Sequence, residues 1–272
     1  MTGHKVLTLP HHKGKMNADE LKEYIKTFYN DQNREHMVYP GMVYISHPTE
    51  YGTLYTREEL QKLAQIALKH DIVIIADEVY REYVYDGAKQ VSMLEFPEIA
   101  ENCIIIDSES KRYSMCGVRI GFMVTRSKLI RAAAMKFAQA RLSPVLLGQI
   151  IAAKAHENDK KYIESVREEY TKRRNLLVKL LNEIPGIICP TPKGAFYCVA
   201  ELPIDDAEKF AQWLLEEYSL NNETVMVAPA GGFYSNPELG KRQIRIAYVL
   251  KEEDLRRSVE LLKDALQKYN AR

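Results

Sequence analysis

The chain has 272 residues, of which 46% are apolar and 28% are charged, and its formal net charge at pH 7 is +1. This is the composition of an ordinary folded protein, long enough for one large domain and a smaller one. A net charge so close to zero gives no global field that would recruit nucleic acid or an anionic membrane, so we expect neither as a partner. The absence of an apolar run of signal or membrane-span length favours a cytoplasmic protein.

The first part of the chain alternates segments typical of strands and helices. We expect strands at residues 5–9, 42–46, 72–76, 103–107 and 119–124. Two capping boxes, Asn17 with Glu20 and Thr56 with Glu59, predict that helices begin directly after Asn17 and Thr56. The apolar run at 72–76 is typical of a parallel strand covered on both faces. Together these segments predict an α/β fold with a parallel-rich sheet and helices on both sides.

The pattern changes after about residue 143. A long amphipathic helix is expected at 159–183, followed by short strands at 195–200, 224–228 and 243–249 and a last helix at 252–269. This predicts a smaller α+β domain joined to the first by the long helix. We therefore divide the chain into a partial large domain, 1–150, and a small C-terminal domain, 151–272, that includes the connecting helix.

The segment with the most chemistry follows the strand at 103–107. The amine of Lys111 can form a Schiff base with an aldehyde cofactor. The hydroxyls of Ser108 and Ser110 and the guanidinium of Arg119 can converge on a phosphate of that cofactor. A solvated loop is the alternative for any single lysine, but the combined spacing of these four residues favours a cofactor site. The four cysteines show no CxxC motif and no metal-ligand spacing, so we expect no metal.

Ser-x-Ser-Lys at 108–111, followed by Gly-x-Arg-x-Gly at 117–121, resembles the cofactor-lysine signature of class I/II aminotransferases, which are pyridoxal-phosphate enzymes of fold type I. Within that family the chain is most similar to the aspartate-aminotransferase type. Asp77-Glu-Val-Tyr80 resembles the family's Asp-x-x-Tyr element. The resemblance implies that Lys111 is the Schiff-base lysine, that Asp77 pairs with the pyridinium nitrogen and that Tyr80 donates to the phenolate oxygen. A carboxylate beside the ring nitrogen keeps it protonated, so the ring can accept electrons. A helix cap is the alternative role for Asp77.

Three later segments, at 192–197, 227–233 and 243–248, also resemble this family. The last implies that Arg245 binds the α-carboxylate of the substrate. Alternation along the strand places Arg245 on the face opposite Ile244 and Ile246. An arginine in an apolar strand needs a partner, which is either the substrate carboxylate, favoured by the fold, or a structural aspartate or glutamate.

The chain departs from the family in its first part. Thr49 replaces the asparagine that would touch the phenolate oxygen, and residues 3–56 resemble low-specificity threonine aldolases, which are lyases with the same cofactor and fold. Measured against the family, we expect an N-terminally truncated fold with an incomplete large-domain sheet. The expected losses are the specificity arm, the glycine-rich phosphate turn and the ring-stacking residue, which would weaken cofactor binding.

The leading hypothesis is an aminotransferase that moves an amino group from an aspartate-like amino acid to a 2-oxo acid, with Lys111 as the general base. A threonine-aldolase-type lyase is one alternative, and a remnant of the fold that turns nothing over is another. The expected partners are small-molecule amino and 2-oxo acids, with a homodimer whose interface is reduced by the missing arm.

Overall fold

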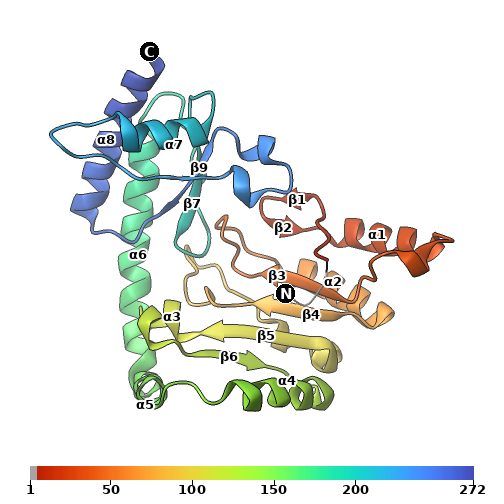
Figure 1. Cartoon of the computed structure of the whole chain (residues 1–272). Coiled ribbons are helices and arrows are strands. Elements are labelled where there is room, and N and C mark those ends of the chain that lie inside the picture. Colours follow the sequence, from red (N-terminus) through yellow and green to blue (C-terminus); the bar gives the residue numbers. More distant parts are fainter. Residues whose placement is uncertain (1–4) are drawn as a thin grey trace. The chain divides into compact units, whose positions relative to one another are not determined.

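The computed structural model describes residues 5–272, which form two compact units. The first unit comprises the described residues up to Thr49 together with Thr53–Glu164, and the second comprises Glu50–Gly52 together with Ser165–Arg272. Figure 1 shows the elements of both units. The division falls inside helix α6 (Asp159–Asn182). The sequence-based boundary near residue 150 stays a prediction.

The first unit is built on a mixed sheet with strand order β3-β4-β5-β6 in the described chain. Strands β3 (Met42–Ser46), β4 (Val73–Asp77) and β5 (Cys103–Ser108) are parallel, whereas β6 (Gly121–Val124) runs antiparallel to β5. The predicted α/β fold is confirmed, with an antiparallel edge strand that the sequence did not indicate. The reason lies in the link after β5, which holds only the short helices α3 (Glu109–Arg112) and η4 (Cys116–Val118) and no full crossover helix.

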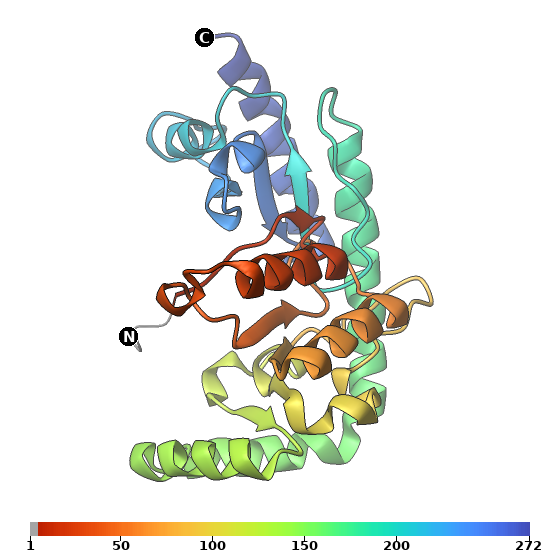
Figure 2. The same cartoon turned by 90° about the vertical axis from the view of Figure 1, so that its right-hand side faces the viewer.

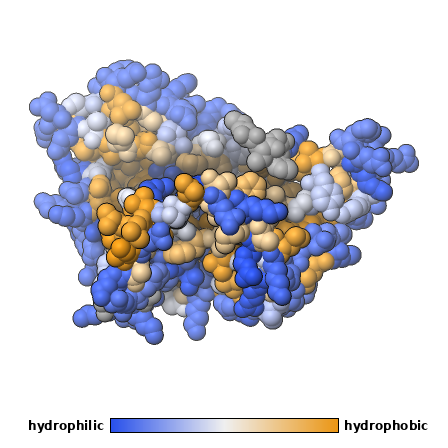
Figure 3. Space-filling model, turned by 60° about the horizontal axis from the view of Figure 1, so that its bottom comes forward, coloured by the Kyte–Doolittle hydropathy of each residue, from blue (hydrophilic) through white to orange (hydrophobic). Residues whose placement is uncertain are grey.

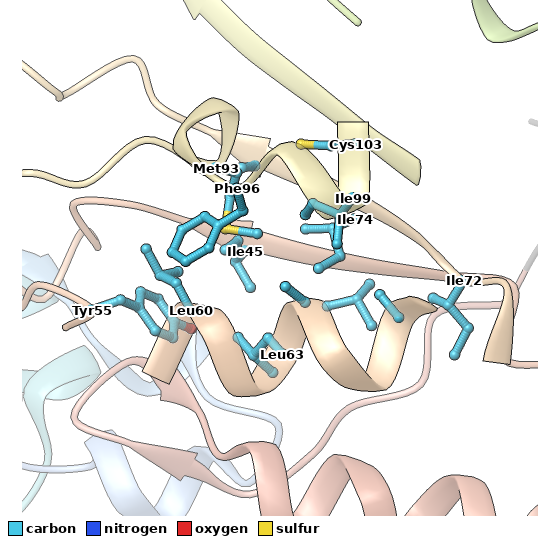
Figure 4. Close-up of a cluster of buried hydrophobic side chains, with 14 of the residues drawn as sticks. Ile45, Tyr55, Leu60, Leu63, Ile72, Ile74, Met93, Phe96, Ile99 and Cys103 are labelled. Atoms are coloured by element: carbon cyan, nitrogen blue, oxygen red, sulfur yellow. The ribbon is translucent and has the colours of Figure 1, made fainter. Parts of the chain in front are cut away.

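One face of this sheet is covered by helices α1 (Ala18–Asn30) and α2 (Arg57–His70). Alternate strand residues are buried on this face, as the period of two requires. They pack against the apolar stripe of α2 in the cluster drawn in Figure 4. The buried residues of the strands and of α2 are Val43, Ile45, Ile74, Ala76, Cys103, Ile105, Leu60, Leu63, Ala64 and Ala67.

Capping residues fix where both helices begin. The Thr56 hydroxyl accepts the Glu59 amide and the Glu59 carboxylate accepts the Thr56 amide, so the predicted capping box of α2 is confirmed. Asn17 also caps α1, but the carboxylate of Glu20 pairs with the imidazole of His12 at 2.9 Å instead.

The strand predicted at 5–9 is wrong. The chain here pairs only across a tight turn, between β1 (His11–His12) and β2 (Lys15–Met16). The turn residues Lys13 and Gly14 both have positive φ, 55° and 81°, and this tight turn pairs residues 11–12 with residues 15–16. The pairing therefore begins after the predicted strand at 5–9. The short 3-10 helices of this unit are η1 (Arg34–His36), η2 (Met93–Glu95), η3 (Pro97–Asn102) and η5 (His156–Asn158).

Helices α4 (Lys128–Arg141) and α5 (Leu146–Ala155) follow β6. Figures 1 and 2 place α4 beyond β6, at the edge of the sheet. Both helices expose large apolar side chains, and Figure 3, in which the side carrying these helices comes forward, shows hydrophobic residues gathered there. The most exposed are Leu129, Phe137, Leu146, Leu147 and Ile150. Among residues 5–272, no helix has the length and apolarity needed to cross a membrane.

The second unit contains an antiparallel sheet of order β7-β9-β8, formed by β7 (Tyr197–Glu201), β9 (Gln243–Ala247) and β8 (Ala228–Pro229). Helices α7 (Ala207–Glu216) and α8 (Glu252–Asn270) complete it, with η6 (Gly231–Phe233) and η7 (Pro237–Gly240). The strand predicted at 224–228 is largely wrong, because pairing with β9 begins only at Ala228. The small α+β domain is otherwise as predicted.

Candidate active site

The carboxyl ends of two neighbouring parallel strands carry the predicted cofactor residues. Asp77 ends β4 and pairs in register with Ile106 of β5, two residues before Ser108. Register partners in parallel strands share a sheet face, so Asp77 and Ser108 lie on the same face, opposite the core cluster. Since α3 follows Ser108 directly, Asp77 and the turn that carries Lys111 meet at one edge of the sheet.

The carboxylate of Asp77 is held by two hydrogen bonds. Its Oδ2 accepts the hydroxyl of Tyr44, from β3, at 2.9 Å, and its Oδ1 accepts the amide of Val79 at 3.3 Å. The bond to Val79 closes a turn; residues 78–92 contain no helix, so the alternative role of Asp77 as a helix cap is wrong. The sequence patterns did not predict the bond from Tyr44. The register of β3 and β4 explains it, because Ser46 pairs with Asp77 and Tyr44 lies two residues before Ser46.

The residue after Asp77 serves the core rather than the site. Glu78 is fully buried, and its Oε1 accepts the Ser92 hydroxyl at 3.0 Å and the Met93 amide at 2.9 Å. Burial raises the pKa of this carboxyl above its ordinary value, against the opposing effect of those hydrogen bonds. Tyr80, predicted to reach the cofactor ring, lies in the following turn and is also buried.

The lysine turn begins with a serine cap. The Ser108 Oγ accepts the Ser110 amide at 3.1 Å and lies 2.9 Å from the Ser110 Oγ, so the two hydroxyls predicted to bind phosphate are adjacent. Lys111 follows, half-buried, and its carbonyl accepts the hydroxyl of Tyr83 at 2.6 Å. Tyr83 itself is buried, so this bond ties the lysine backbone to the turn after β4.

Arg119 and Thr49 form hydrogen bonds with residues three or four positions away in the chain. The exposed Arg119 has left-handed backbone (φ 60°) and donates from Nη1 to the Cys116 carbonyl at 2.9 Å. Buried Thr49 uses its hydroxyl to close a loop, with the Thr53 hydroxyl at 2.7 Å and the Thr53 amide at 3.1 Å. The predicted phosphate role of Arg119 and the predicted ring contact of Thr49 both stay predictions.

Arg245 lies in the second unit, on β9. Its guanidinium is sandwiched between the rings of Tyr197 and Phe233, 4.5 and 4.3 Å from their centroids, and it forms an ion pair with Glu50. The sequence left a substrate carboxylate and a structural acid open as partners, and in the structure the partner is a glutamate. The contact is only partly shielded, because the side chain of Arg245 is 23% exposed and that of Glu50 is 46% exposed.

Known proteins with similar sequences and structures are aminotransferases. The family described as aminotransferase class I and II matches residues 3–262. Aspartate aminotransferase from Bacillus subtilis (strain 168) is 33% identical over 233 residues, which cover 83% of this chain and 56% of that protein. The solved structure of an aromatic aminotransferase from Pyrococcus horikoshii OT3 matches with a TM-score of 0.78 and 29% identity, covering 94% of this chain and 65% of that one.

Aromatic-amino-acid aminotransferase 2 from Thermococcus litoralis is 28% identical over 267 residues, or 97% of this chain and 64% of that protein. This chain thus spans 56% to 64% of the length of these two relatives.

Proposed function

The chain belongs to the class I and II aminotransferase family, and from this membership we propose that it transfers an amino group from an amino acid to a 2-oxo acid. Its cofactor is pyridoxal 5′-phosphate. The observation that carries the proposal is the meeting of Asp77 and the Lys111 turn at the carboxyl ends of two neighbouring parallel strands. An aspartate-like donor is the substrate we propose, supported by the name of the Bacillus relative.

The donor groups at this edge fit the cofactor. A half-buried lysine suits the aldehyde, two hydroxyls 2.9 Å apart suit the phosphate, and a carboxylate held by Tyr44 suits the ring nitrogen. When bound, the cofactor supplies an electron sink for the bond that breaks at the substrate Cα.

The roles of the side chains follow from their chemistry. The amine of Lys111 would hold the cofactor covalently and, when a substrate is bound, would serve as the base that accepts the proton from the substrate Cα. Asp77 holds the proton on the ring nitrogen, because a nearby negative charge favours the cationic form of the ring. We assign Ser108, Ser110 and Arg119 to the phosphate, and Tyr80 and Thr49 to the phenolate oxygen.

Arg245 takes the substrate carboxylate in this proposal. The ion pair with Glu50 supports this role, because it shows that the guanidinium can bind a carboxylate while it lies over the rings of Tyr197 and Phe233. Such faces hold the planar guanidinium in one orientation and leave its edge for a carboxylate ligand.

The test begins with binding. Pyridoxal phosphate is added, the visible absorption band is recorded, and borohydride is used to make the bond to the protein permanent before peptide mass spectrometry. We expect the label on Lys111 and its loss in Lys111→Ala, with no change in Lys154→Ala, which removes an exposed lysine of the same unit. A missing band, or a band unchanged in Lys111→Ala, would overturn the proposal.

Activity assays then separate the alternatives. We expect transfer between glutamate and oxaloacetate and no cleavage of threonine. Cleavage of threonine without transfer would identify a lyase, as the resemblance of residues 3–56 to threonine aldolases suggested. Lysine labelling without either reaction would identify a cofactor-binding protein that turns nothing over.

We also infer a homodimer. The exposed apolar side chains of α4 and α5 support it, because soluble monomers rarely expose large contiguous apolar patches. Light scattering after size exclusion should give twice the chain mass of 31.3 kDa, and Leu147→Glu should shift it towards the monomer. A monomeric parent protein would contradict this inference.

A further inference from the structure

A carboxylate without exposed surface lies between the two serines of the lysine turn. Glu109 is the first residue of α3 and is 0% exposed. Its Oε1 lies 2.8 Å from Nε2 of His156, whereas Oε2 has no hydrogen-bond partner within residues 5–272. A buried carboxylate is costly unless it is well paired, so the imidazole of His156 is the group that makes this position tolerable for an acid.

The same imidazole reaches the other end of the helix. Nδ1 of His156 lies 3.1 Å from the hydroxyl of Tyr113, the residue that directly follows α3. The two rings meet edge to face, with centroids 5.3 Å apart and an interplanar angle of 89°. Glu109, His156 and Tyr113 thus form one hydrogen-bonded chain that joins both ends of the short helix on which Lys111 sits.

A second buried pair supports the same helix from the strand side. Arg112 donates to the Asp107 carboxylate at 2.5 Å, and both side chains are about nine-tenths shielded from solvent. Arg112 also lies 3.4 Å from Glu82, and Arg81 lies 3.6 Å from Asp107. Glu109 and Arg112, the two ends of the helix, are therefore held by contacts with side chains outside it, whereas Ser110 and Lys111 between them are only half-buried.

A helix of four residues cannot hold its own geometry, because a single turn forms at most one or two internal hydrogen bonds. Its orientation must come from outside contacts. The contact from His156 comes from a residue 47 positions from Glu109, and it reaches the helix through a single side chain.

We propose that His156 and Glu109 are positioning residues for Lys111. They hold the α3 turn so that the lysine amine and the hydroxyls of Ser108 and Ser110 face the cofactor together. This inference rests on the proposed function of Lys111 and adds the residues that set its geometry. A purely structural pair would stabilise the fold without affecting how the cofactor binds.

The experiment compares cofactor binding in four variants of the full chain. His156→Ala leaves the buried carboxyl group without its partner, and Glu109→Gln replaces that group with an amide. The double variant Glu109→Gln/His156→Gln replaces the carboxyl–imidazole pair with two amides that can bond each other. The control is His12→Ala, which breaks the exposed pair of His12 with Glu20 in the same unit.

Each variant is titrated with pyridoxal phosphate by absorbance, and its rate of borohydride labelling at Lys111 is measured by mass spectrometry. We expect His156→Ala to raise the Kd of the cofactor at least tenfold and to slow labelling, with the far-ultraviolet circular dichroism unchanged. The double variant should recover part of the affinity, and His12→Ala should behave as the parent.

Should His156→Ala fail to fold, Tyr113→Phe and the double variant decide the question. Tyr113→Phe removes only the hydroxyl, and we expect it to raise the Kd about threefold. Parent-like affinity and labelling in all folded variants would overturn this inference and leave the proposed function intact. A parent protein that takes no label at Lys111 would overturn the proposed function, and this inference with it.

Discussion

The guanidinium of Arg245 donates to the carboxylate of Glu50, although the two residues are 195 positions apart in the chain. The contact is fixed on both sides. Arg245 is clamped between two rings, and the loop of Glu50 is held by the Tyr51 hydroxyl, which donates to the Phe233 carbonyl at 2.9 Å. The residue assigned to the substrate carboxylate therefore already has an internal carboxylate as its partner.

Glu50→Gln should increase the affinity for carboxylate ligands. A ligand that binds Arg245 must displace Glu50, and a neutral amide is a weaker competitor for the guanidinium than a carboxylate. Because the pair is partly exposed, we expect a moderate effect, with the Kd of succinate falling roughly three- to tenfold. Isothermal titration calorimetry with the cofactor present measures it.

The matched control is Glu201→Gln. It releases Arg242, the residue directly before strand β9, from a comparable ion pair. Succinate affinity should not change in this control. An unchanged affinity in Glu50→Gln would mean that Glu50 does not compete for Arg245, and an unchanged affinity in Arg245→Lys would remove the carboxylate role of Arg245 itself.

Gly52→Ala should destabilise the protein more than Gly87→Ala. Both glycines have positive φ, 79° and 72°, where alanine costs about 1 kcal/mol. At Gly52 the added Cβ would also lie 2.3 Å from the Cβ of Pro192, whereas at Gly87 it would meet no described atom within 4 Å. We expect a further loss of roughly 1–3 kcal/mol at Gly52. Urea unfolding of both variants measures the difference, and equal losses would contradict the predicted overlap.

His47 should make the protein sensitive to acid. It is fully buried, its Nδ1 accepts the Tyr55 amide at 3.3 Å, and burial lowers its pKa to about 4. Between pH 6.5 and 4 the unfolded chain binds this proton and the folded protein does not. Stability therefore falls as the pH drops through this window, by about 3 kcal/mol from this residue.

His47→Gln should remove that part of the pH dependence. The free energy of unfolding is measured by urea titration at pH 4, 5, 6 and 7, and the slope between pH 4 and 6.5 should flatten. His36→Gln, which changes an exposed histidine of the same unit, should keep the parent slope. A parent slope in His47→Gln would show that other groups cause the acid sensitivity.

Asp77→Asn should slow amino transfer strongly. An amide cannot supply the negative charge that keeps the ring nitrogen protonated, and proton-transfer contributions of this kind are worth roughly 100-fold or more in rate. Single-turnover kinetics with bound cofactor measure the loss without the contribution of product release. Asp71→Asn is the control, because Asp71 ends α2 in a left-handed conformation that asparagine also adopts. A parent rate in Asp77→Asn would remove the ring-nitrogen role.

The features that the sequence predicted well are set by residues close together in the chain. The capping box of α2 depends on Thr56 and Glu59, three positions apart, and the apolar stripe of α2 on a period of 3.6. The lysine motif lies within one turn after a strand. The family resemblance set Asp77 beside this motif, and the parallel pairing of β4 and β5 brings both to the same edge of the sheet. Their roles in binding a cofactor stay predictions.

The features that the sequence missed depend on partners far apart in the chain. The residues around Glu109 and Arg245 do not identify His156 and Glu50 as their partners. The antiparallel direction of β6 was missed for a different reason, since period and composition do not encode which way a strand runs, and only the short link after β5, without a crossover helix, could have indicated it. An acid placed between two serines, directly after an apolar strand, was the one available signal for the His156 contact.

The path of the backbone also limits how this protein can be dissected. The segment Glu50–Gly52 belongs to the second unit although its neighbours on both sides belong to the first, so the chain changes unit after Thr49, after Gly52 and after Glu164. A single cleavage after Glu164 releases all of the first unit together with Glu50–Gly52, but no single cleavage releases the second unit whole. In a fragment that starts at Ser165, Arg245 would lack Glu50 as its partner and Pro192 would lack its contact with Gly52. A C-terminal unit prepared alone should therefore have the segment Glu50–Gly52 grafted onto it.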